Sequence, residues 1–176
     1  EMPLNLVESG QSYLHYNKGL VNLYALQDYI TADSVNIALK RFIKDWNTFE
    51  QGNKQERYPT SSDLLGYFRA VTPDSLHDII HDLFETITLY EHAVQSAEVV
   101  PLSKDRYQIE LELKTEKYRV DSVGIAHEIP TNDWVDIGVY AEDEEGKEYL
   151  VYLKKHHFSK STDSLIIELK ERPTAI

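Results

Sequence analysis

The chain has 176 residues, 41% hydrophobic and 27% charged, as expected for one folded domain or two small ones. With 30 acidic and 18 basic residues its net charge is −12, which argues against a phosphate-binding surface, so we expect no nucleic-acid partner. The absence of cysteine excludes disulfides and thiolate metal sites.

The first half of the chain has the apolar spacing of helices. A helix is predicted over residues 18–30, and a second is expected from an N-cap at Asp33. A polar loop over 47–59 and a short helix over 61–70 follow, before a fourth helix that starts at the Thr-Pro-Asp of 72–74. The stripe of the first helix consists of Leu20, Leu23, Tyr24 and Gln27, with Val21 and Leu26 nearby, and that of the fourth of Leu76, Ile79, Ile80, Leu83, Phe84 and Ile87.

The second half changes to a period of two, which is typical of half-buried strands. Apolar residues alternate with polar ones over 107–113, and Val135 to Tyr140 predicts another strand. A hairpin turn is expected at Asp143-Glu144-Glu145-Gly146. Further strands are expected near 95–101, 117–123, 147–157 and 163–170. The sequence therefore predicts an α+β protein, with an α-helical subdomain over 1–92 followed by a small antiparallel β-sandwich over 93–176.

One pair of histidines has metal-site spacing. His77 and His81 lie four residues apart, as zinc ligands do on a helix, but Asp78 stands where such enzymes place a catalytic glutamate. The position of the third ligand is Val100, and the nearest acid, Glu98, lies two positions earlier in a predicted strand. We therefore interpret both histidines as residues of a polar helix face and expect no metal site in this chain.

Other candidate patterns are weaker. His156 and His157 are adjacent in a predicted strand, so their rings point to opposite faces and cannot share a metal locally. The acids at 143–145 lack the regular spacing of a calcium loop, and a solvated turn is the better interpretation. No glycine-rich phosphate loop and no serine nucleophile elbow occurs.

The most informative segment is Tyr-Leu-His-Tyr-Asn-Lys-Gly at 13–19, directly before an apolar helix. Its residue types alone leave two interpretations open. Tyr13 and Tyr16 could simply pack as amphipathic aromatics, with Gly19 permitting a close approach between helices. Alternatively, one tyrosine could serve as a hydrogen-bond donor or acid in catalysis.

The run Tyr16-Asn17-Lys18-Gly19 resembles the Tyr-x-Lys-Gly segment of aminopeptidase N-like zinc metallopeptidases, the gluzincin aminopeptidases. The closer likeness is to bacterial members that are fused to an ABC-transporter permease. Five segments similar to that subgroup occur in the same order, at residues 15–19, 24–30, 38–42, 58–64 and 73–90. Residues 133–143 also look like part of the family's sandwich, so the likeness spans nearly the whole chain.

This resemblance implies a catalytic role for Tyr16. In the family, the matching phenol donates a hydrogen bond to the oxyanion that forms when zinc-bound water attacks the peptide carbonyl. A tyrosine hydroxyl is a suitable neutral donor for that charge. Lys18 and Gly19 match the same motif, and we expect them to have structural roles at the helix start.

The resemblance also implies what this chain lacks. The family's H-E-x-x-H motif, its further glutamate ligand and a glycine-rich exopeptidase motif lie upstream of Tyr-x-Lys-Gly, and none occurs here. We therefore expect the downstream part of a zinc aminopeptidase, with no cofactor in this chain, zinc bound by upstream residues of the parent protein, and no activity of the chain alone.

The expected partners follow from the same likeness. They are the upstream catalytic lobe, the permease part and a peptide substrate. The parent is expected to be associated with a bacterial membrane, whereas this part is expected to be soluble and to self-associate through an apolar surface of its helical half. The alternative is a non-catalytic peptide-binding or interaction module of a transporter, in which case the upstream zinc ligands would be broken.

Overall fold

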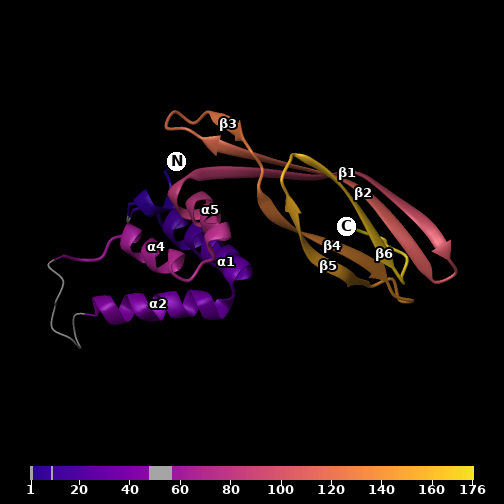
Figure 1. The fold of residues 1–176 in the computed structure, drawn as a ribbon, viewed down its shortest axis with the longest axis horizontal. Coiled ribbons are helices and arrows are strands. Elements are labelled where there is room, and N and C mark those ends of the chain that lie inside the picture. The colour runs from indigo at the N-terminus through magenta and orange to yellow at the C-terminus, as the bar shows by residue number, and fades with distance from the viewer. Residues whose placement is uncertain (1, 9, 48–56) are drawn as a thin grey trace. The chain divides into compact units, whose positions relative to one another are not determined.

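The computed structural model describes residues 2–8, 10–47 and 57–176, and the chain divides into two compact units (Figure 1). Unit 1 comprises residues 1–88 and 120–125, and unit 2 comprises residues 89–119 and 126–176. The described residues form helices and antiparallel sheets, which confirms the predicted α+β class. The boundary expected between 92 and 93 falls inside strand β1 (Ile87–Ser103), which begins in one unit and continues in the other.

Unit 1 consists of short helices around one apolar core. Its α-helices are α1 (Gly19–Ile30), α2 (Ala32–Trp46), α4 (Ser61–Arg69) and α5 (His77–Ile80). Shorter helical turns cover Leu4–Leu6, Tyr13–Lys18, Asp74–Leu76 and His81–Glu85. The core is formed by Leu26, Ile30, Val35, Ala38, Leu65, Phe68, Ile80 and Phe84. The stacked rings of Phe68 and Phe84, with centroids 6.1 Å apart, join α4 to the turn after α5.

Two helix starts are set by threonine caps. At α4, the Thr60 hydroxyl accepts a hydrogen bond from the Asp63 N–H, and the Asp63 carboxylate accepts one from the Thr60 N–H. This reciprocal arrangement is a capping box, and it satisfies donors that a helix start leaves without partners. The N-cap of α2 is Thr31 and not the predicted Asp33, which lies in the first turn of the helix. The loop predicted over 47–59 lies mostly outside the described residues.

The predicted fourth helix is divided. Residues 74–85 form three short helical pieces, and Ile87 begins β1 instead of ending a helix. Two of its apolar residues, Ile80 and Phe84, are nevertheless buried in the core of unit 1. The apolar spacing therefore identified the buried side of this segment but not its helical continuity.

Unit 2 contains two antiparallel sheets. Their further strands are β2 (Arg106–Val120), β3 (Ala126–Ile129), β4 (Asp133–Glu142), β5 (Glu148–Phe158) and β6 (Thr162–Leu169). One sheet has the order β1-β2-β3 with β6 also paired to β2, and the other consists of β4 and β5. Figure 1 shows β1 and β2 as one long hairpin. The core combines both sheets through Ile109, Leu111, Leu113, Ile137, Val139, Phe158, Ile167 and Leu169.

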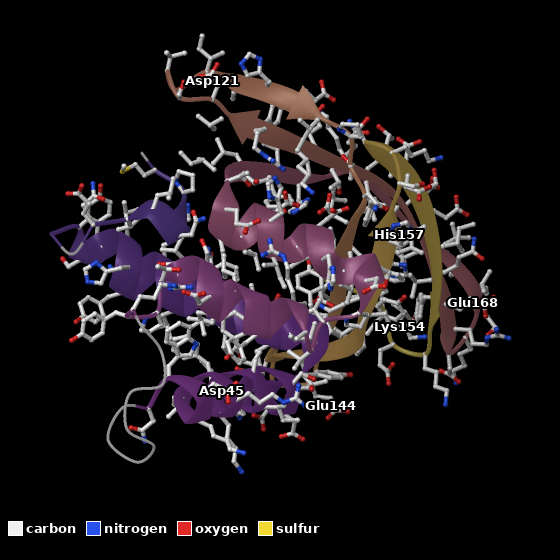
Figure 2. The ribbon with its side chains drawn as sticks, turned by 60° about the vertical axis from the view of Figure 1, so that its left-hand side comes forward. Asp45, Asp121, Glu144, Lys154, His157 and Glu168 are labelled. Atoms are coloured by element: carbon white, nitrogen blue, oxygen red, sulfur yellow. The ribbon has the colours of Figure 1, made fainter. Side chains whose placement is uncertain are left out.

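The turns that connect the strands use aspartate and glycine. Between β4 and β5, the Asp143 carboxylate accepts hydrogen bonds from the Glu145 and Lys147 N–H groups, and Gly146 has a φ of 78° that favours glycine. The hairpin turn predicted at 143–146 is therefore confirmed. Between β2 and β3, the Asp121 carboxylate holds a second turn by accepting hydrogen bonds from the Val123 and Ile125 N–H groups. Figure 2 labels Asp121 at this turn.

Strand β2 joins two strands that the sequence predicted separately, near 107–113 and 117–123. Its buried positions continue in alternation from Leu113 to Thr115 and Lys117, which are 2% and 5% exposed. Because these two residues are polar, the apolar pattern stops before the strand does. The strand then ends at Val120, ahead of the turn at Asp121.

Candidate functional site

Tyr16 lies in the helical turn Tyr13–Lys18, which runs directly into α1. Its side chain is 70% exposed, and its ring centroid lies 4.4 Å from that of His15. Its hydroxyl makes no hydrogen bond with any of the residues that the structure describes. The phenol can therefore donate to a group from outside the described part of the chain.

Tyr16 belongs to an exposed face along one side of the helix. This face, called here the Tyr16 face, consists of Tyr13, Tyr16, Leu20 and Tyr24, which are between 59% and 73% exposed. Their spacing of three, four and four residues places them in one row along a helix. Four large aromatic and aliphatic side chains in a row exceed the scattered exposure that is normal for a protein surface.

The predicted stripe of α1 coincides only in part with the side that packs, where Leu23 contacts the core of unit 1 and the neighbouring Leu26 belongs to it. Leu20 and Tyr24 belong to the predicted stripe and are exposed, whereas the buried positions are Asn22, Leu26 and Ile30. Asn22 is fixed there because its side-chain amide donates to the Leu83 carbonyl. Since α1 is apolar on most of its sides, its spacing alone could not select the side that packs.

Lys18 ends the helical turn Tyr13–Lys18 and Gly19 begins α1, so both lie within a continuous helical segment and not at the helix start that the sequence predicted. Gly19 has an ordinary helical backbone, with φ −60° and ψ −44°, and a Cβ added to it would meet nothing within 4 Å. Among the described residues, therefore, neither backbone strain nor a close approach requires glycine at this position. Lys18 is half-buried and forms no ion pair with a described residue.

A hollow of about 190 Å³ lies beside this segment in unit 1. His15 and Gly19 line it, together with Asn5 from the turn Leu4–Leu6 and Ser61 from the start of α4. Most of the other lining is apolar, with four leucines and two phenylalanines. We call it the Asn5 hollow.

The histidines with metal-site spacing have separate structural partners. The Nε2 atom of His77 lies 3.0 Å from the Thr72 carbonyl and 3.2 Å from that of Arg69, so this nitrogen donates to backbone. His81 instead lies 3.1 Å from the Glu85 carboxylate. The Arg69 guanidinium, hydrogen-bonded to Glu85 at 2.5 Å, lowers the pKa of that carboxyl.

No group of three His, Cys, Asp or Glu side chains in the described part of the chain is arranged to hold a metal ion. The described residues therefore do not fit a zinc site.

The adjacent histidines of β5 also have different partners. His156 is half-buried, and its Nε2 lies 2.8 Å from the Tyr152 hydroxyl. His157 is exposed, lies 2.7 Å from the Asn132 side-chain oxygen and has its ring 5.0 Å from that of Trp134 (Figure 2). Burial and a neighbouring Lys154 lower the pKa of His156.

No protein-family model matches this chain, and no curated protein matches it. In the part of the chain that the structure describes, none of the helices combines the length and the apolar character of a membrane span.

Sequence reasoning did not single out Asn5. Its only signal is a polar residue between Leu4 and Leu6, which is too common to indicate a site. Its proximity to His15 depends on how the turn Leu4–Leu6 packs beside α4 and the Tyr13–Lys18 turn.

Proposed function

We propose that this chain is the downstream part of a zinc-dependent aminopeptidase, in which Tyr16 donates a hydrogen bond to the oxyanion during hydrolysis of an N-terminal peptide bond. In this proposal, residues 1–92 complete the catalytic domain, and residues 93–176 form the β-sandwich that follows it in the chain. The parent is an aminopeptidase joined to an ABC-transporter permease at a bacterial membrane. The chain alone is inactive.

The observation that carries the proposal is the position of Tyr16 within a Tyr-x-Lys-Gly motif. Its phenol is 70% exposed and has no hydrogen-bond partner among the described residues. The helix holds the Tyr16 phenol in place, and no described residue accepts its hydrogen bond. The phenol is therefore suited to stabilise a negative charge that develops on a bound substrate. The Tyr16 face supplies an apolar surface on which the upstream lobe would pack.

The described residues offer no zinc ligand set, so the proposal assigns no metal step to this chain. What Tyr16 contributes is a neutral O–H donor aimed at the carbonyl oxygen of the scissile peptide bond. As the carbonyl becomes tetrahedral its oxygen gains negative charge, and the hydrogen bond then strengthens. This difference between ground state and transition state is what raises the rate.

The test uses the full-length parent and an aminoacyl p-nitroanilide. Tyr16→Phe is expected to lower kcat by about 10²- to 10³-fold, the range found on removing one oxyanion donor, with unchanged zinc content. Tyr24→Phe is the matched control, because Tyr24 lies on the same face and is 73% exposed. It is expected to keep full turnover. Parent-like turnover of Tyr16→Phe would remove Tyr16 from catalysis.

A second candidate function is a peptide-binding module without catalysis. The exposed row of aromatic side chains on the Tyr16 face favours it, since aromatic residues are common in recognition surfaces. Saturable peptide binding by a full-length protein that hydrolyses no aminoacyl substrate would support this function and contradict the enzyme.

A further inference from the structure

Strand β4 is paired along one edge with β5, but its other edge is paired at one end only. There the Tyr140 N–H donates to the Ala175 carbonyl at 2.9 Å, and the Thr174 N–H donates to the Tyr140 carbonyl at 2.9 Å. The contact is antiparallel, and within the described part of the chain it is the one bridge on this edge. The edge therefore already accepts an extended backbone at one point.

The remainder of this edge presents backbone groups that lack strand partners. N–H and C=O groups point to alternate sides along a strand, so those of Gly138 and Asp136 lie on the same side as those of Tyr140. The extra residue of the nearby bulge belongs to β5, so this alternation continues through β4. Among the described residues, no strand pairs with Gly138 or Asp136 on that side. An unpaired row of this kind can pair with an added strand.

A groove of about 180 Å³ follows the open edge within unit 2. We call it the β4 groove. Residues 135–138 of β4 line it, together with His92 and Val94 of β1 and Thr115 of β2. Ile176 also lines it, directly after the paired Ala175. Because the pairing is antiparallel, a strand that continues it runs from Tyr140 towards Gly138 and along this groove.

The exposure of Val94 shows that the space between the two sheets is unfilled at the groove. His92 Nδ1 lies 3.4 Å from Thr115 Oγ1, and Thr115 is only 2% exposed, so this side of β1 faces the interior of unit 2. Val94 lies two residues further along and therefore points to the same side. It is nevertheless 45% exposed. In a sandwich, inward side chains of one sheet pack against the other sheet, and at Val94 that cover is missing.

An extended peptide satisfies both the open edge and the unfilled groove. Its N–H and C=O groups have the spacing of the β4 ladder, while every second side chain points between the sheets. A small apolar ligand would fill the groove but would leave the backbone groups of the edge unpaired. Residues 174 and 175 bind the neighbouring part of the same edge in this extended form.

We propose that the β4 groove binds an extended peptide from another molecule, which lies antiparallel to β4 and continues the pairing that Ala175 begins. Its side chains opposite Ile137 and Val135 are apolar, because these β4 residues belong to the core cluster or pack against it. Its side chain opposite the exposed Asp136 is basic, which suits a chain of net charge −12. The proposal does not rest on the aminopeptidase function, because all of these residues belong to unit 2.

Binding is measured by titrating the chain with acetyl-Thr-Val-Lys-Val-Thr-amide, whose valines match Ile137 and Val135 and whose lysine matches Asp136. We expect saturable NMR shifts of Gly138 and Val94 with a Kd on the order of 1 mM. At about ten times that Kd, exchange of the Gly138 N–H with water should slow about tenfold, since only the free protein exposes it. The Ile137 N–H points towards β5 and should exchange equally with and without peptide.

Three results of this titration would overturn the proposal. The first is the absence of saturation up to about ten times the expected Kd. The second is saturation without protection of the Gly138 N–H, because the peptide would then bind without adding a strand. The third is protection of Gly138 that rises with protein concentration in the absence of peptide, which would show that a second copy occupies the edge.

Two altered peptides separate backbone pairing from side-chain burial. N-methylation of the lysine removes the N–H that donates to the Asp136 carbonyl, and replacement of both valines by serine removes the apolar side chains. Each peptide is expected to bind at least about tenfold more weakly. Equal binding of the N-methylated peptide would contradict strand addition, and equal binding of the serine peptide would contradict insertion into the groove.

The decisive variant is Val94→Glu, which places a charge in the groove. Peptide affinity should fall at least about tenfold, while the melting temperature changes little because Val94 is 45% exposed. The matched control is Leu102→Glu, in the same strand and also 45% exposed but outside the groove, and it should bind normally. Unchanged affinity in Val94→Glu, or an equal loss in Leu102→Glu, would refute the site. If Val94→Glu fails to fold, the altered peptides still decide the question on the unmodified chain.

Discussion

The Lys117 ammonium and the Asp133 carboxylate lie 2.9 Å apart in unit 2, with side chains only 6% and 7% exposed. The pair joins β2 to the first residue of β4. The Tyr90 ring centroid lies 5.5 Å from the Lys117 Nζ, and the Asn132 N–H donates to Asp133. The charges are thus held by further polar and aromatic contacts, which a buried ion pair needs in order to offset its loss of hydration.

Breaking this pair should destabilise unit 2 strongly. Asp133→Asn or Lys117→Met is expected to lower the free energy of unfolding by about 3–5 kcal/mol, because each leaves one charge buried without its counter-charge. The measurement is urea unfolding followed by the fluorescence of Trp134, which lies in β4. The double variant Lys117→Met/Asp133→Leu should recover most of the loss.

The exposed pair Lys155–Asp136 is the control for this prediction. Its side chains are 28% and 43% exposed, and Lys155→Met should cost no more than about 1 kcal/mol. Similar costs for the buried and the exposed pair would show that burial does not determine the energy of the Lys117–Asp133 contact.

The two sides of α1 should differ in their tolerance of substitution. Leu26 is fully buried, and Leu26→Ala should cost about 2–5 kcal/mol through lost contacts and a cavity. Leu20 is 70% exposed, and Leu20→Ala should change stability by less than about 0.5 kcal/mol. Thermal unfolding by circular dichroism compares them, and a reversed order would mean that α1 packs through the Tyr16 face.

The Tyr16 face should also control self-association of the chain. Leu20→Asn with Tyr24→Gln is expected to shift any concentration-dependent oligomer toward monomer, since it removes exposed apolar area. Sedimentation velocity over a range of concentrations measures the change. An oligomer that persists in the double variant would place the contact elsewhere on the chain.

The capping box of α4 should contribute measurably to stability. Thr60→Ala removes the cap and should cost about 0.5–2 kcal/mol. Arg57 pairs with the same Asp63 at 2.6 Å, but its side chain is 57% exposed, so Arg57→Met should have the smaller effect. Thermal unfolding followed by helix content compares the stability of the two variants. An equal loss of stability in both would show that the Thr60 cap does not contribute more than the Arg57–Asp63 pair.

Stability should fall as pH decreases below about 6.5, partly because of His92. Burial lowers the pKa of this imidazole, and nearby Asp133 only partly opposes the effect. As the pH falls, His92 therefore takes up a proton in the unfolded chain before it does so in the folded chain. Its contribution to stability is fully present above about pH 6.5, the usual pKa of histidine, and is lost between that pH and the lower pKa of His92 in the folded protein. Urea unfolding at pH 7.5, 6.5 and 5.5 measures the slope. His92→Gln should flatten it, and an unchanged slope would exclude His92 as a source.

Several local features could be predicted because neighbouring residues encode them. The change from helical to strand period, the start of α4 after Thr60 and the turn at Asp143–Gly146 all depend on side chains a few residues apart. The continuation of β2 could not be predicted, because its buried positions at Thr115 and Lys117 are polar. Their burial requires partners distant in sequence, such as Asp133.

For the candidate site, the sequence by itself determined the Tyr-x-Lys-Gly motif at Tyr16 and its place at the start of an apolar helix. Only the tertiary structure decided that Tyr16 is exposed, that the packed side of α1 contains Leu26, and that Asn5 and His15 line one hollow. The physical reason is the separation along the sequence of the residues that determine each feature. A helix and its caps are set by residues within one or two turns, whereas the side that packs is chosen by surfaces far away in the chain.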